Sequence, residues 1–257
     1  MKRIRVIPVL LVNKGKLVKT VKFKDPVYVG DPINAVKIFN DKEVDELIVL
    51  DITASREQRH PDFEMVGELA GECFMPLAYG GGITSLEDVK KIFDKGIEKV
   101  SLNTGLLEQK GLIENIARLY GSQSVVASVD VSRNMFGKYV AYTRGGREKC
   151  SLGLKELLNV LESRGVGEVM INSIDQDGTG KGYDLDLVKF VAESVTLPVI
   201  ACGGAGTISH LTQAVVAGHA SAVAAGSMFV FNGKHKAVLI SYPSQEVLTK
   251  ELYAQIP

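Results

Sequence analysis

The sequence predicts an α/β fold, a single (β/α)8 (TIM) barrel domain over residues 1–257 built from two homologous half-barrels. Three observations predict it: eight short apolar runs alternate with helical patterns, each run is continuously apolar, and an internal repeat relates the two halves of the chain. Parallel neighbouring strands need a crossover helix, and continuously apolar strands are covered on both faces. An open doubly wound sheet is the alternative, although two halves of four strand–helix units close naturally into a barrel.

The expected strands are β-branched and apolar, and each is followed by a polar or glycine-rich turn. They are Val6–Val12, Leu47–Leu50, Met75–Tyr79, Val100–Leu102, Val125–Val129, Val169–Ile171, Leu197–Ala201 and Ala222–Ala225. Helical patterns lie between them at Pro32–Phe39, Phe63–Ala70, Leu86–Phe93, Ile113–Leu119, Leu154–Leu161, Leu185–Val191 and Leu211–Val216. Ser85, with an acid at Asp88, is typical of a helix start, and Gly96 and Gly218 are expected to end their helices.

The internal repeat has an offset of 122 residues, close to half the chain. Asp45–Ile52 (DELIVLDI) recurs as Gly167–Ile174 (GEVMINSI). Two adjacent glycines that follow the third run recur at the same offset after the seventh run, as Gly203 and Gly204. This spacing predicts two structurally equivalent halves.

Composition and charge narrow the class of protein. Hydrophobic residues make up 46% and charged residues 23%, which excludes a disordered chain. Lys+Arg and Asp+Glu both number 30, so the net charge is zero. Without an overall positive charge to attract phosphates, we expect no nucleic-acid partner. No apolar run is long enough to span a bilayer. The first residues are basic and then apolar, which is typical of a first strand rather than of a signal peptide. The three cysteines are widely spaced, as expected of free thiols. We therefore expect a cytoplasmic protein with no membrane partner.

Two glycine-rich turns are candidate phosphate sites. Gly80–Gly82 follows the third expected strand and Gly203–Gly206 follows the seventh, and the first amides of a following helix are free to bind an anion. The expected phosphate- and substrate-binding residues of these loops and their neighbours are Gly81, Gly82, Asn103, Thr104, Gly203, Gly204, Gly226 and Ser227. Two such sites related by the repeat predict a ligand with two phosphates, and simple tight turns are the alternative for either loop.

Four aspartates stand at expected strand ends, the working face of a barrel of this class: Asp51, Asp130, Asp175 and Asp177. An acid at the mouth of an apolar barrel is costly unless it binds or catalyses, so general acid–base work is the functional interpretation. Asp130 and Asp177 are the preferred catalytic candidates. For Asp51 and Asp175 a turn or helix-capping role is an equal alternative.

Metal and cofactor chemistry find little support in the sequence. The four histidines, His60, His210, His219 and His235, lack the spacing of metal ligands, so we expect no metal site and no cofactor. Cys202 lies beside a glycine-rich turn but has no histidine placed with it, which favours a small packing residue over a nucleophile.

Seven segments taken together are specific: Ile7–Leu10, Asp45–Ser55, Gly80–Ile83, Lys99–Thr104, Gly121–Val126, Ser173–Thr179 and Ile200–Gly206. In this order, over nearly the whole chain, the sequence resembles the cyclase subunit of imidazole glycerol phosphate synthase. The resemblance implies a (β/α)8 barrel that takes ammonia from a partner glutaminase. The ammonia passes through the barrel interior to a site on the opposite face.

The resemblance also implies an acid–base pair of aspartates at the ends of the first and fifth strands. Asp130 matches the second of them, whereas the first falls at Leu11, which has no proton to exchange. Each such proton transfer contributes roughly 10²–10⁴-fold to a rate, so ring closure to an imidazole is in question. Lys19 matches a lysine that binds substrate in the family. Asp177 and Gly178 belong to the same expected substrate site.

The ammonia gate of the family is retained. The resemblance implies a ring of two basic and two acidic residues at the N-terminal end of the barrel, here Arg5, Glu46, Lys99 and Glu168. Such charges need mutual pairing to survive burial, and a purely structural ion-pair ring is the alternative. Glu98 stands where the family has an acid facing its glutaminase, so we expect that partner on the N-terminal face.

Two segments depart from ordinary cyclases, Lys19–Asn34 and Ala225–Pro243. They are similar to cyclase paralogues from surface-polysaccharide clusters that make acetamidino sugars. The resemblance implies a glutaminase, this barrel and an ATP-dependent amidotransferase that together convert an N-acetyl group to an acetamidino group on a phosphorylated or nucleotide-linked sugar. There are three alternatives. The chain could be a working cyclase in which Asp51 or Asp177 replaces the missing acid, or a silent barrel that only activates or scaffolds the glutaminase. The third is an unrelated phosphosugar isomerase.

Overall fold

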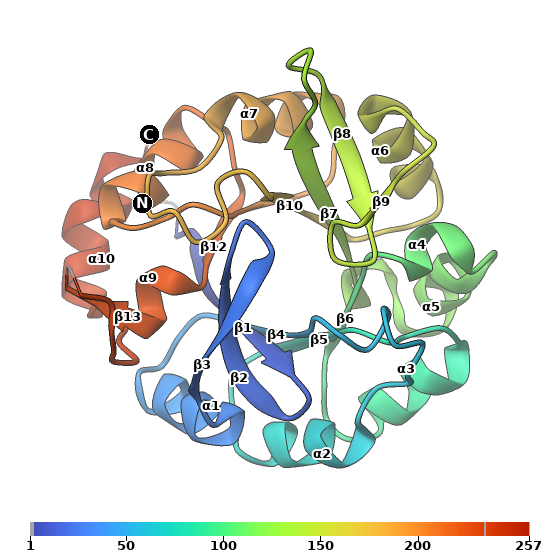
Figure 1. Ribbon diagram of the computed structural model, residues 1–257, viewed down its shortest axis with the longest axis horizontal. Coiled ribbons are helices and arrows are strands. Elements are labelled where there is room, and N and C mark those ends of the chain that lie inside the picture. Colours follow the sequence, from blue (N-terminus) through green and yellow to red (C-terminus); the bar gives the residue numbers. More distant parts are fainter. Residues whose placement is uncertain (1–2, 234, 257) are drawn as a thin grey trace.

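The computed structural model describes residues 3–233 and 235–256 and confirms the predicted (β/α)8 barrel (Figure 1). Eight parallel strands form its wall, and the last pairs with the first. In spatial order they are β1 (Arg5–Asn13), β4 (Leu47–Asp51), β5 (Leu77–Gly80), β6 (Lys99–Leu102), β7 (Val125–Arg133), β10 (Glu168–Ser173), β11 (Val199–Cys202) and β12 (Ala222–Ala225).

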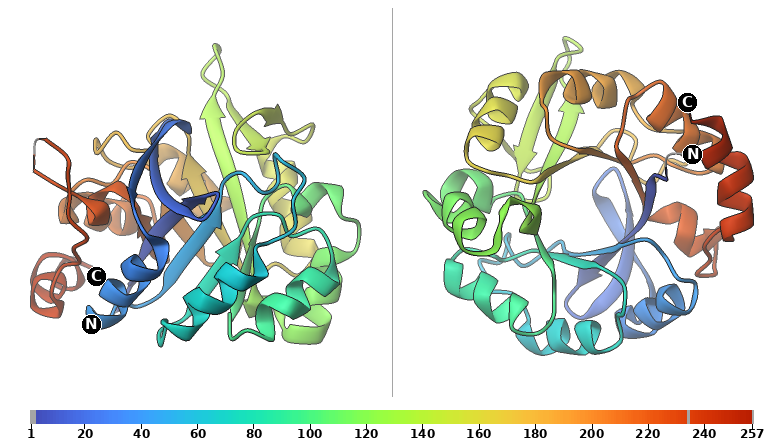
Figure 2. Two further views of the ribbon diagram at one scale, coloured as in Figure 1. Left: turned by 60° about the horizontal axis from the view of Figure 1, so that its bottom comes forward. Right: turned by 180° about the vertical axis from the view of Figure 1, so that it is seen from behind.

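Helices surround this wall (Figure 2, right). The main ones are α1 (Pro32–Asp41), α2 (Phe63–Gly71), α3 (Leu86–Phe93), α5 (Leu112–Tyr120), α6 (Leu154–Ser163), α7 (Leu185–Ser194), α8 (Ile208–Val216) and α10 (Gln245–Glu251). Shorter ones are α4 (Gly105–Glu108), α9 (Ser227–Val230) and two 3₁₀ turns, Ser122–Ser124 and Tyr253–Gln255. In the described part of the chain, each helix is too short or too polar to cross a bilayer.

Local sequence signals explain how several helices begin and end. Ser85 and Asp88 form the expected capping box at the start of α3, each side chain accepting a hydrogen bond from the other's backbone amide. Gly96 follows α3 with a φ of +99°, as a glycine stop requires. After α8 the prediction is wrong in detail, because the left-handed residue is His219 rather than Gly218. Gly218 is instead required for packing, since a Cβ there would meet Val188 at 2.9 Å.

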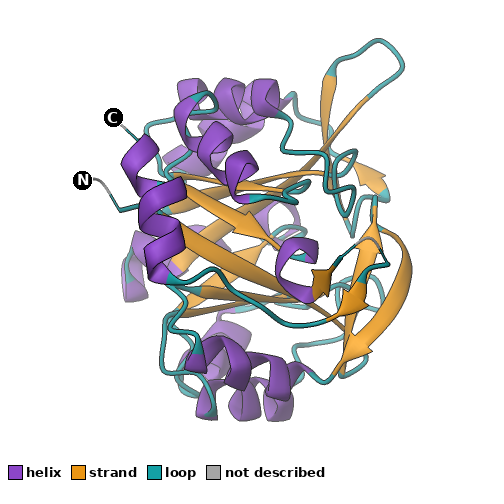
Figure 3. Cartoon of the chain, turned by 90° about the vertical axis from the view of Figure 1, so that its left-hand side faces the viewer, coloured by secondary structure: helices purple, strands orange, loops and turns teal. Residues whose placement is uncertain are grey.

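Antiparallel hairpins extend the sheet at the C-terminal ends of two strands and were not predicted. β2 (Lys16–Val21) pairs with β1 and β3 (Lys24–Gly30), while β8 (Tyr139–Thr143) pairs with β7 and β9 (Glu148–Lys149). The β7–β8 hairpin projects from this end of the barrel, and β2–β3 lies over its centre (Figures 1 and 3). A small separate hairpin joins β13 (Phe231–Asn232) to β14 (Ala237–Val238).

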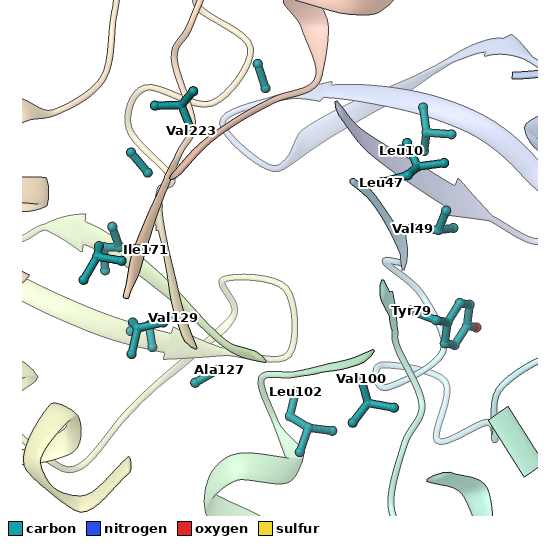
Figure 4. Packing of buried hydrophobic residues seen from close by; sticks show 14 of the residues in the cluster. Leu10, Leu47, Val49, Tyr79, Val100, Leu102, Ala127, Val129, Ile171 and Val223 are labelled. Atoms are coloured by element: carbon teal, nitrogen blue, oxygen red, sulfur yellow. The ribbon is translucent and has the colours of Figure 1, made fainter. Parts of the chain in front are cut away.

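The core has two parts, divided by the barrel wall. The larger part lies between strands and helices, where Leu10, Val49, Leu102 and Val129 point away from the barrel axis (Figure 4). The smaller part fills the barrel interior with Ile7, Val9, Ile48, Ala78, Val126, Met170, Ile200, Cys202, Ala222 and Ala224. Strands buried on both faces explain the continuously apolar runs in the sequence.

Hydrogen bonds reproduce the internal repeat. The amide of Leu47 donates to the carbonyl of Pro76 over 2.9 Å, and the amide of Val169 donates to Pro198 over 3.0 Å, 122 residues further on. Both prolines lie inside the ranges predicted as strands, but β5 and β11 begin just after them. Proline has no amide to donate to a neighbouring strand, so it stands before the ladder instead of within it.

Candidate functional site

A pocket opens at the C-terminal ends of the barrel strands, the face on which barrels of this class carry their chemistry. It brings together nearly all residues predicted for catalysis and ligand binding. Those lining it are Leu11, Lys19, Asp51, Gly81, Asn103, Thr104, Asp130, Asp177, Gly178, Gly203, Gly204, Gly226 and Ser227. Gly82 is not among the lining residues, and its amide donates instead to the Ser55 hydroxyl over 3.2 Å.

Asp130 lies at the centre of this site, near the end of β7, and is 7% exposed. Asn103 donates its side-chain amide to one carboxylate oxygen and Asn172 donates to the other, each over 3.2 Å. Burial raises the pKa of Asp130 to about 7; the charge of Asp177 acts in the same direction and the Asn172 hydrogen bond opposes it. Because this pKa is near neutrality, the carboxyl group can both give and take a proton.

Lys19 reaches the same pocket from β2 and is 5% exposed. Its ammonium group donates to the carbonyl of Val9 over 2.7 Å and lies directly against the Cα of Gly226. Any side chain at residue 226 would displace it, which explains the glycine there. Burial lowers the pKa of Lys19 to about 8, although the charge of Asp177 opposes the shift.

Asp177 connects the pocket to the β2–β3 hairpin. One of its carboxylate oxygens accepts the hydroxyl of Thr20 over 2.8 Å and the amide of Phe23 over 3.2 Å. The amide of Lys22 also donates to the carbonyl of Asp177 over 3.0 Å. Burial raises the pKa of Asp177 despite these bonds and the charge of Lys19. The contacts assign Asp177 an anchoring role, and its catalytic role stays a prediction.

Asp51 and Asp175 both make the kind of turn-stabilising contact that the sequence left open as the alternative to catalysis. Asp51 accepts the amides of Thr53 and Ala54 and forms an ion pair with Arg59 at 3.2 Å. Asp175 accepts from Ser132 and from the amide of Arg133, bracing β7. Asp51 lines the pocket but already accepts hydrogen bonds from its own loop, whereas Asp175 does not line the pocket and is bound to β7.

The two glycine-rich turns have matching geometry on opposite sides of the pocket. Gly81 and Gly203, which the repeat relates, have φ values of +117° and +87°. A Cβ on Gly203 would meet the Asn172 side-chain oxygen at 2.7 Å, and one on Gly81 would run into the backbone of Asp51. Each turn therefore needs glycine in order to pass closely over the end of the neighbouring barrel strand, which is β4 for Gly81 and β10 for Gly203.

The four predicted gate residues meet at the opposite end of the barrel. Lys99 donates to Glu46 over 2.9 Å and to Glu168 over 2.8 Å, and Arg5 contacts the same two carboxylates, reaching Glu168 at 2.6 Å. The contacts form a closed ring of alternating charges. Burial alone would raise the pKa of Glu168, but hydrogen bonds from Arg5 and Lys99 outweigh it and lower that pKa. The lowered pKa favours the charged form of Glu168, which pairs with both basic side chains of the ring.

Other predicted residues have simpler environments. Glu98 is exposed beside Lys99, at the gate end of the barrel, and accepts the amide of Leu77 over 2.7 Å, so it caps the start of β5. Burial raises the pKa of the Cys202 thiol to about 12, which suits packing rather than nucleophilic attack. Over residues 3–233 and 235–256, acidic, histidine and cysteine side chains form no cluster suited to a metal ion.

Asn172 is one of several pocket residues that sequence reasoning missed. It follows the apolar run Val169–Ile171, and alternation along the strand from Glu168 places it on the inward face. That alternation was the available signal. Its pairing with Asp130 depends on the register of β10 against β7, which joins these two residues directly.

Comparisons with known proteins agree with this geometry. The family model described as "Histidine biosynthesis protein" matches residues 5–236. A Pseudomonas aeruginosa protein provisionally named imidazole glycerol phosphate synthase subunit hisF2 is 55% identical over 95% of this chain and 97% of its own length. A similarly named hisF3 of Vibrio vulnificus is 47% identical over 98% and 97%. The imidazole glycerol phosphate synthase subunit HisF of Alkaliphilus metalliredigens is 42% identical over 89% and 90%.

Proposed function

Since the chain belongs to the histidine biosynthesis protein family, among the HisF-like cyclase subunits of imidazole glycerol phosphate synthase, we propose that it is an ammonia-channelling barrel that works with a glutaminase. The glutaminase docks on the N-terminal face, around Arg5 and Glu98. Ammonia enters through the ring, rises through the barrel and leaves at the pocket. An ATP-dependent amidotransferase there uses it to convert an N-acetyl group of a sugar to an acetamidino group.

One observation carries this proposal: the charged ring and the pocket lie at opposite ends of one apolar interior. The ring closes the end formed by the starts of β1, β6 and β10. Above it the interior is lined by small and aliphatic side chains such as Ile7, Ala78 and Ala222. In the proposed route ammonia, a small neutral molecule, passes between these packed side chains, whereas an ion is excluded because a charge without a partner is costly there.

The pocket supports ammonia delivery more than ring closure by this chain. Leu11 stands where the family has the first acid of its pair, and it packs against the interior cluster. Asp51 is bound by its own loop and Asp177 by the β2–β3 hairpin, which leaves Asp130, with its pKa of about 7, as the carboxyl group suited to proton transfer. Acid–base ring closure needs two such groups with complementary roles.

The choice of acetamidino sugars is supported by two segments. The hairpin within Lys19–Asn34 covers the pocket, and Ala225–Pro243 continues from its rim, where Gly226 and Ser227 line it. Both segments are similar to those of acetamidino-modification paralogues, and both lie where they determine which molecule reaches the pocket. A phosphorylated or nucleotide-linked sugar suits the two glycine-rich turns.

A working cyclase is the second candidate, favoured by the pKa of Asp130 near 7 and by both glycine-rich turns. Turnover of the bis-phosphate intermediate of histidine biosynthesis, with ammonium salt and no glutaminase, separates the two. We expect no turnover from the folded protein. Efficient turnover would show that Leu11 is no obstacle and would overturn the proposal.

A second experiment separates a conduit from a scaffold. The complete system is supplied with glutamine labelled with ¹⁵N in its amide, and the label is followed into the sugar or into bulk ammonia. We expect Lys99→Met to divert label from sugar to bulk while glutamine hydrolysis continues, because it opens one side of the ring. Lys95→Met, an exposed lysine nearby in sequence, is the control. Unchanged delivery in Lys99→Met would favour the scaffold.

A further inference from the structure

A second cavity adjoins the pocket beside the first glycine-rich turn, and we call it the side cavity. It lies between the β4–α2 loop, the turn after β5, α4 and the β8–β9 turn. Its volume is about 200 Å³, compared with about 160 Å³ for the pocket. Ser55 and Thr104 line both spaces, so one ligand can extend from the pocket into the side cavity.

The internal repeat does not account for the side cavity. α4 and α9 lie 122 residues apart, so they are equivalent elements of the two half-barrels. The polar side chains that line the side cavity nevertheless have glycine or apolar residues at the equivalent positions of the second half. Gln58, His60, Glu108 and Gln109 correspond to Gly180, Gly182, Val230 and Phe231. The fold is built without polar groups there, so those of the first half are available for a ligand.

Two of these residues are suited to recognising a heterocyclic base. Gln58 is exposed and Gln109 is half-buried, and neither side-chain amide has a hydrogen-bond partner within residues 3–233 and 235–256. Each primary amide offers both a donor and an acceptor. A nucleobase also presents donors and acceptors along its edge, whereas a phosphate group presents acceptors alone. The lining therefore matches a base better than a further phosphate.

Arginines lie where the two spaces meet. Arg56 lines the pocket and Arg144 lines the side cavity. The Arg144 guanidinium donates to Glu108 over 2.9 Å and to the carbonyl of Ser55 over 3.4 Å, while its backbone amide donates to the Thr104 hydroxyl over 3.2 Å. These bonds fix Arg144 at the boundary. Guanidinium groups bind phosphate oxygens in pairs, so this boundary suits a diphosphate.

We infer that the side cavity binds the nucleoside of a nucleoside-diphosphate sugar, with the diphosphate beside Arg144 and the sugar in the pocket. This inference rests on the proposed function, in which a sugar derivative receives the nitrogen, and it names the group that carries the sugar. The order of the parts follows from the proposed route. Ammonia leaves the barrel interior at the pocket, so the sugar lies there and the nucleoside lies further away.

Calorimetric titration of the full chain tests the site without either partner enzyme. Inorganic pyrophosphate, uridine diphosphate and adenosine diphosphate are titrated separately. We expect at least one nucleoside diphosphate to bind about tenfold or more tightly than pyrophosphate, because hydrogen bonds to the base add to those of the phosphates. N-acetylglucosamine 1-phosphate, which has no nucleoside, shows whether a sugar occupies the side cavity instead.

Two substitutions remove the amides that recognise the base. We expect Gln58→Ala and Gln109→Ala each to weaken binding of the tighter nucleotide by about threefold to tenfold, the effect of one hydrogen bond. Both variants should bind pyrophosphate and the sugar phosphate as the unaltered chain does. Gln213→Ala, at an exposed glutamine of α8, is the control and should leave every affinity unchanged.

Arg144→Lys tests the diphosphate position. Lysine keeps the charge but lacks the paired N–H donors, so we expect weaker binding of pyrophosphate and of the nucleotide by a similar factor. Loss of nucleotide binding alone would place Arg144 against the base and would contradict the assigned order of the ligand.

Equal affinity for pyrophosphate and both nucleotides would overturn the inference. So would unchanged nucleotide binding in Gln58→Ala and Gln109→Ala, or weakened binding of the sugar phosphate in these variants. The proposed function fails separately. If a nucleotide binds as expected but labelled glutamine nitrogen never reaches a sugar, the site stands and the proposed reaction does not.

Discussion

At the scale of single residues, Leu11 decides what chemistry remains in the pocket. It lies half-buried near the end of β1 and lines the same pocket as Asp130. A leucine there places an apolar side chain in the pocket that contains Asp130. It supplies no proton donor or acceptor at this position.

Restoring an acid at this position tests that interpretation. We expect Leu11→Asp to turn over the bis-phosphate intermediate at a rate about 100-fold or more above the assay background shown by the unaltered chain, since one proton-transfer group contributes roughly 10²–10⁴-fold. Leu11→Asn has a similar shape without a titratable proton and should show no gain. Steady-state rates with ammonium salt make the comparison, and equal rates in all three proteins would contradict it.

Asp130 makes stability depend on pH in a defined direction. Its pKa is about 7 in the folded protein against an ordinary value of 3.8. Between these values the folded protein holds a proton that the unfolded chain has lost, so this group destabilises the fold as pH rises through that window.

We therefore expect the free energy of unfolding of Asp130→Asn to rise relative to that of the unaltered chain by about 2 kcal/mol between about pH 5.5 and 8. Urea unfolding of both proteins at the two pH values measures the difference. The shifted pKa values of Lys19 and Glu168 are present in both proteins, so their contributions to the pH dependence of stability cancel in the comparison. Parallel pH profiles would show that Asp130 ionises at its ordinary pKa.

At the scale of elements, the two added hairpins are held by different carboxylates of one turn. Asp177 binds Thr20 and Phe23 of the β2–β3 hairpin, while Asp175 binds Ser132 and Arg133 of β7. Residues 175–179 thus set the position of both hairpins around the pocket mouth.

Asp177→Ala is expected to speed hydrogen exchange in residues 16–30 by about tenfold, because it removes two hydrogen bonds from the hairpin. Asp175→Ala is the matched control and should loosen residues 131–143 instead. Exchange measured by mass spectrometry on both variants distinguishes them. Loosening of the same segment by both substitutions would mean that the turn acts as one unit.

The sequence predicted seven of the helices and the eight barrel strands because each has its own local signal, such as the Ser85 cap of α3 or the apolar run of β7. It missed α4, α9, α10 and the hairpins. Lys24–Gly30 is mostly exposed and charged at its start, so it has no apolar pattern of its own. Its strand conformation comes from pairing with β2, which is a tertiary contact.

At the scale of the whole molecule, the two half-barrels predict paired effects of substitution. Gly81 and Gly203 both have positive φ and both lie against the backbone of the preceding strand. We expect Gly81→Ala and Gly203→Ala to destabilise the fold by similar amounts, roughly 2–4 kcal/mol each, from backbone strain and overlap.

Gly15→Ala is the control for that pair, since Gly15 has a φ of +75° and open space around its Cα. Gly15→Ala should lower the free energy of unfolding by only about 1–2 kcal/mol, from backbone strain alone. Urea unfolding gives all three values. Equal losses in the three variants would mean that close approach to the strand contributes nothing.

The sequence by itself determined the barrel, its half-chain repeat, the pocket glycines and the four charges of the ring, because these follow from periodicity, from turns and from a resemblance. Only the tertiary structure decided which carboxylates are free, that Asn172 faces Asp130, and that Lys19 lies against Gly226. These facts depend on the register of strands distant in sequence. Burial and hydrogen bonding across that register set each proton affinity, and no local pattern encodes them.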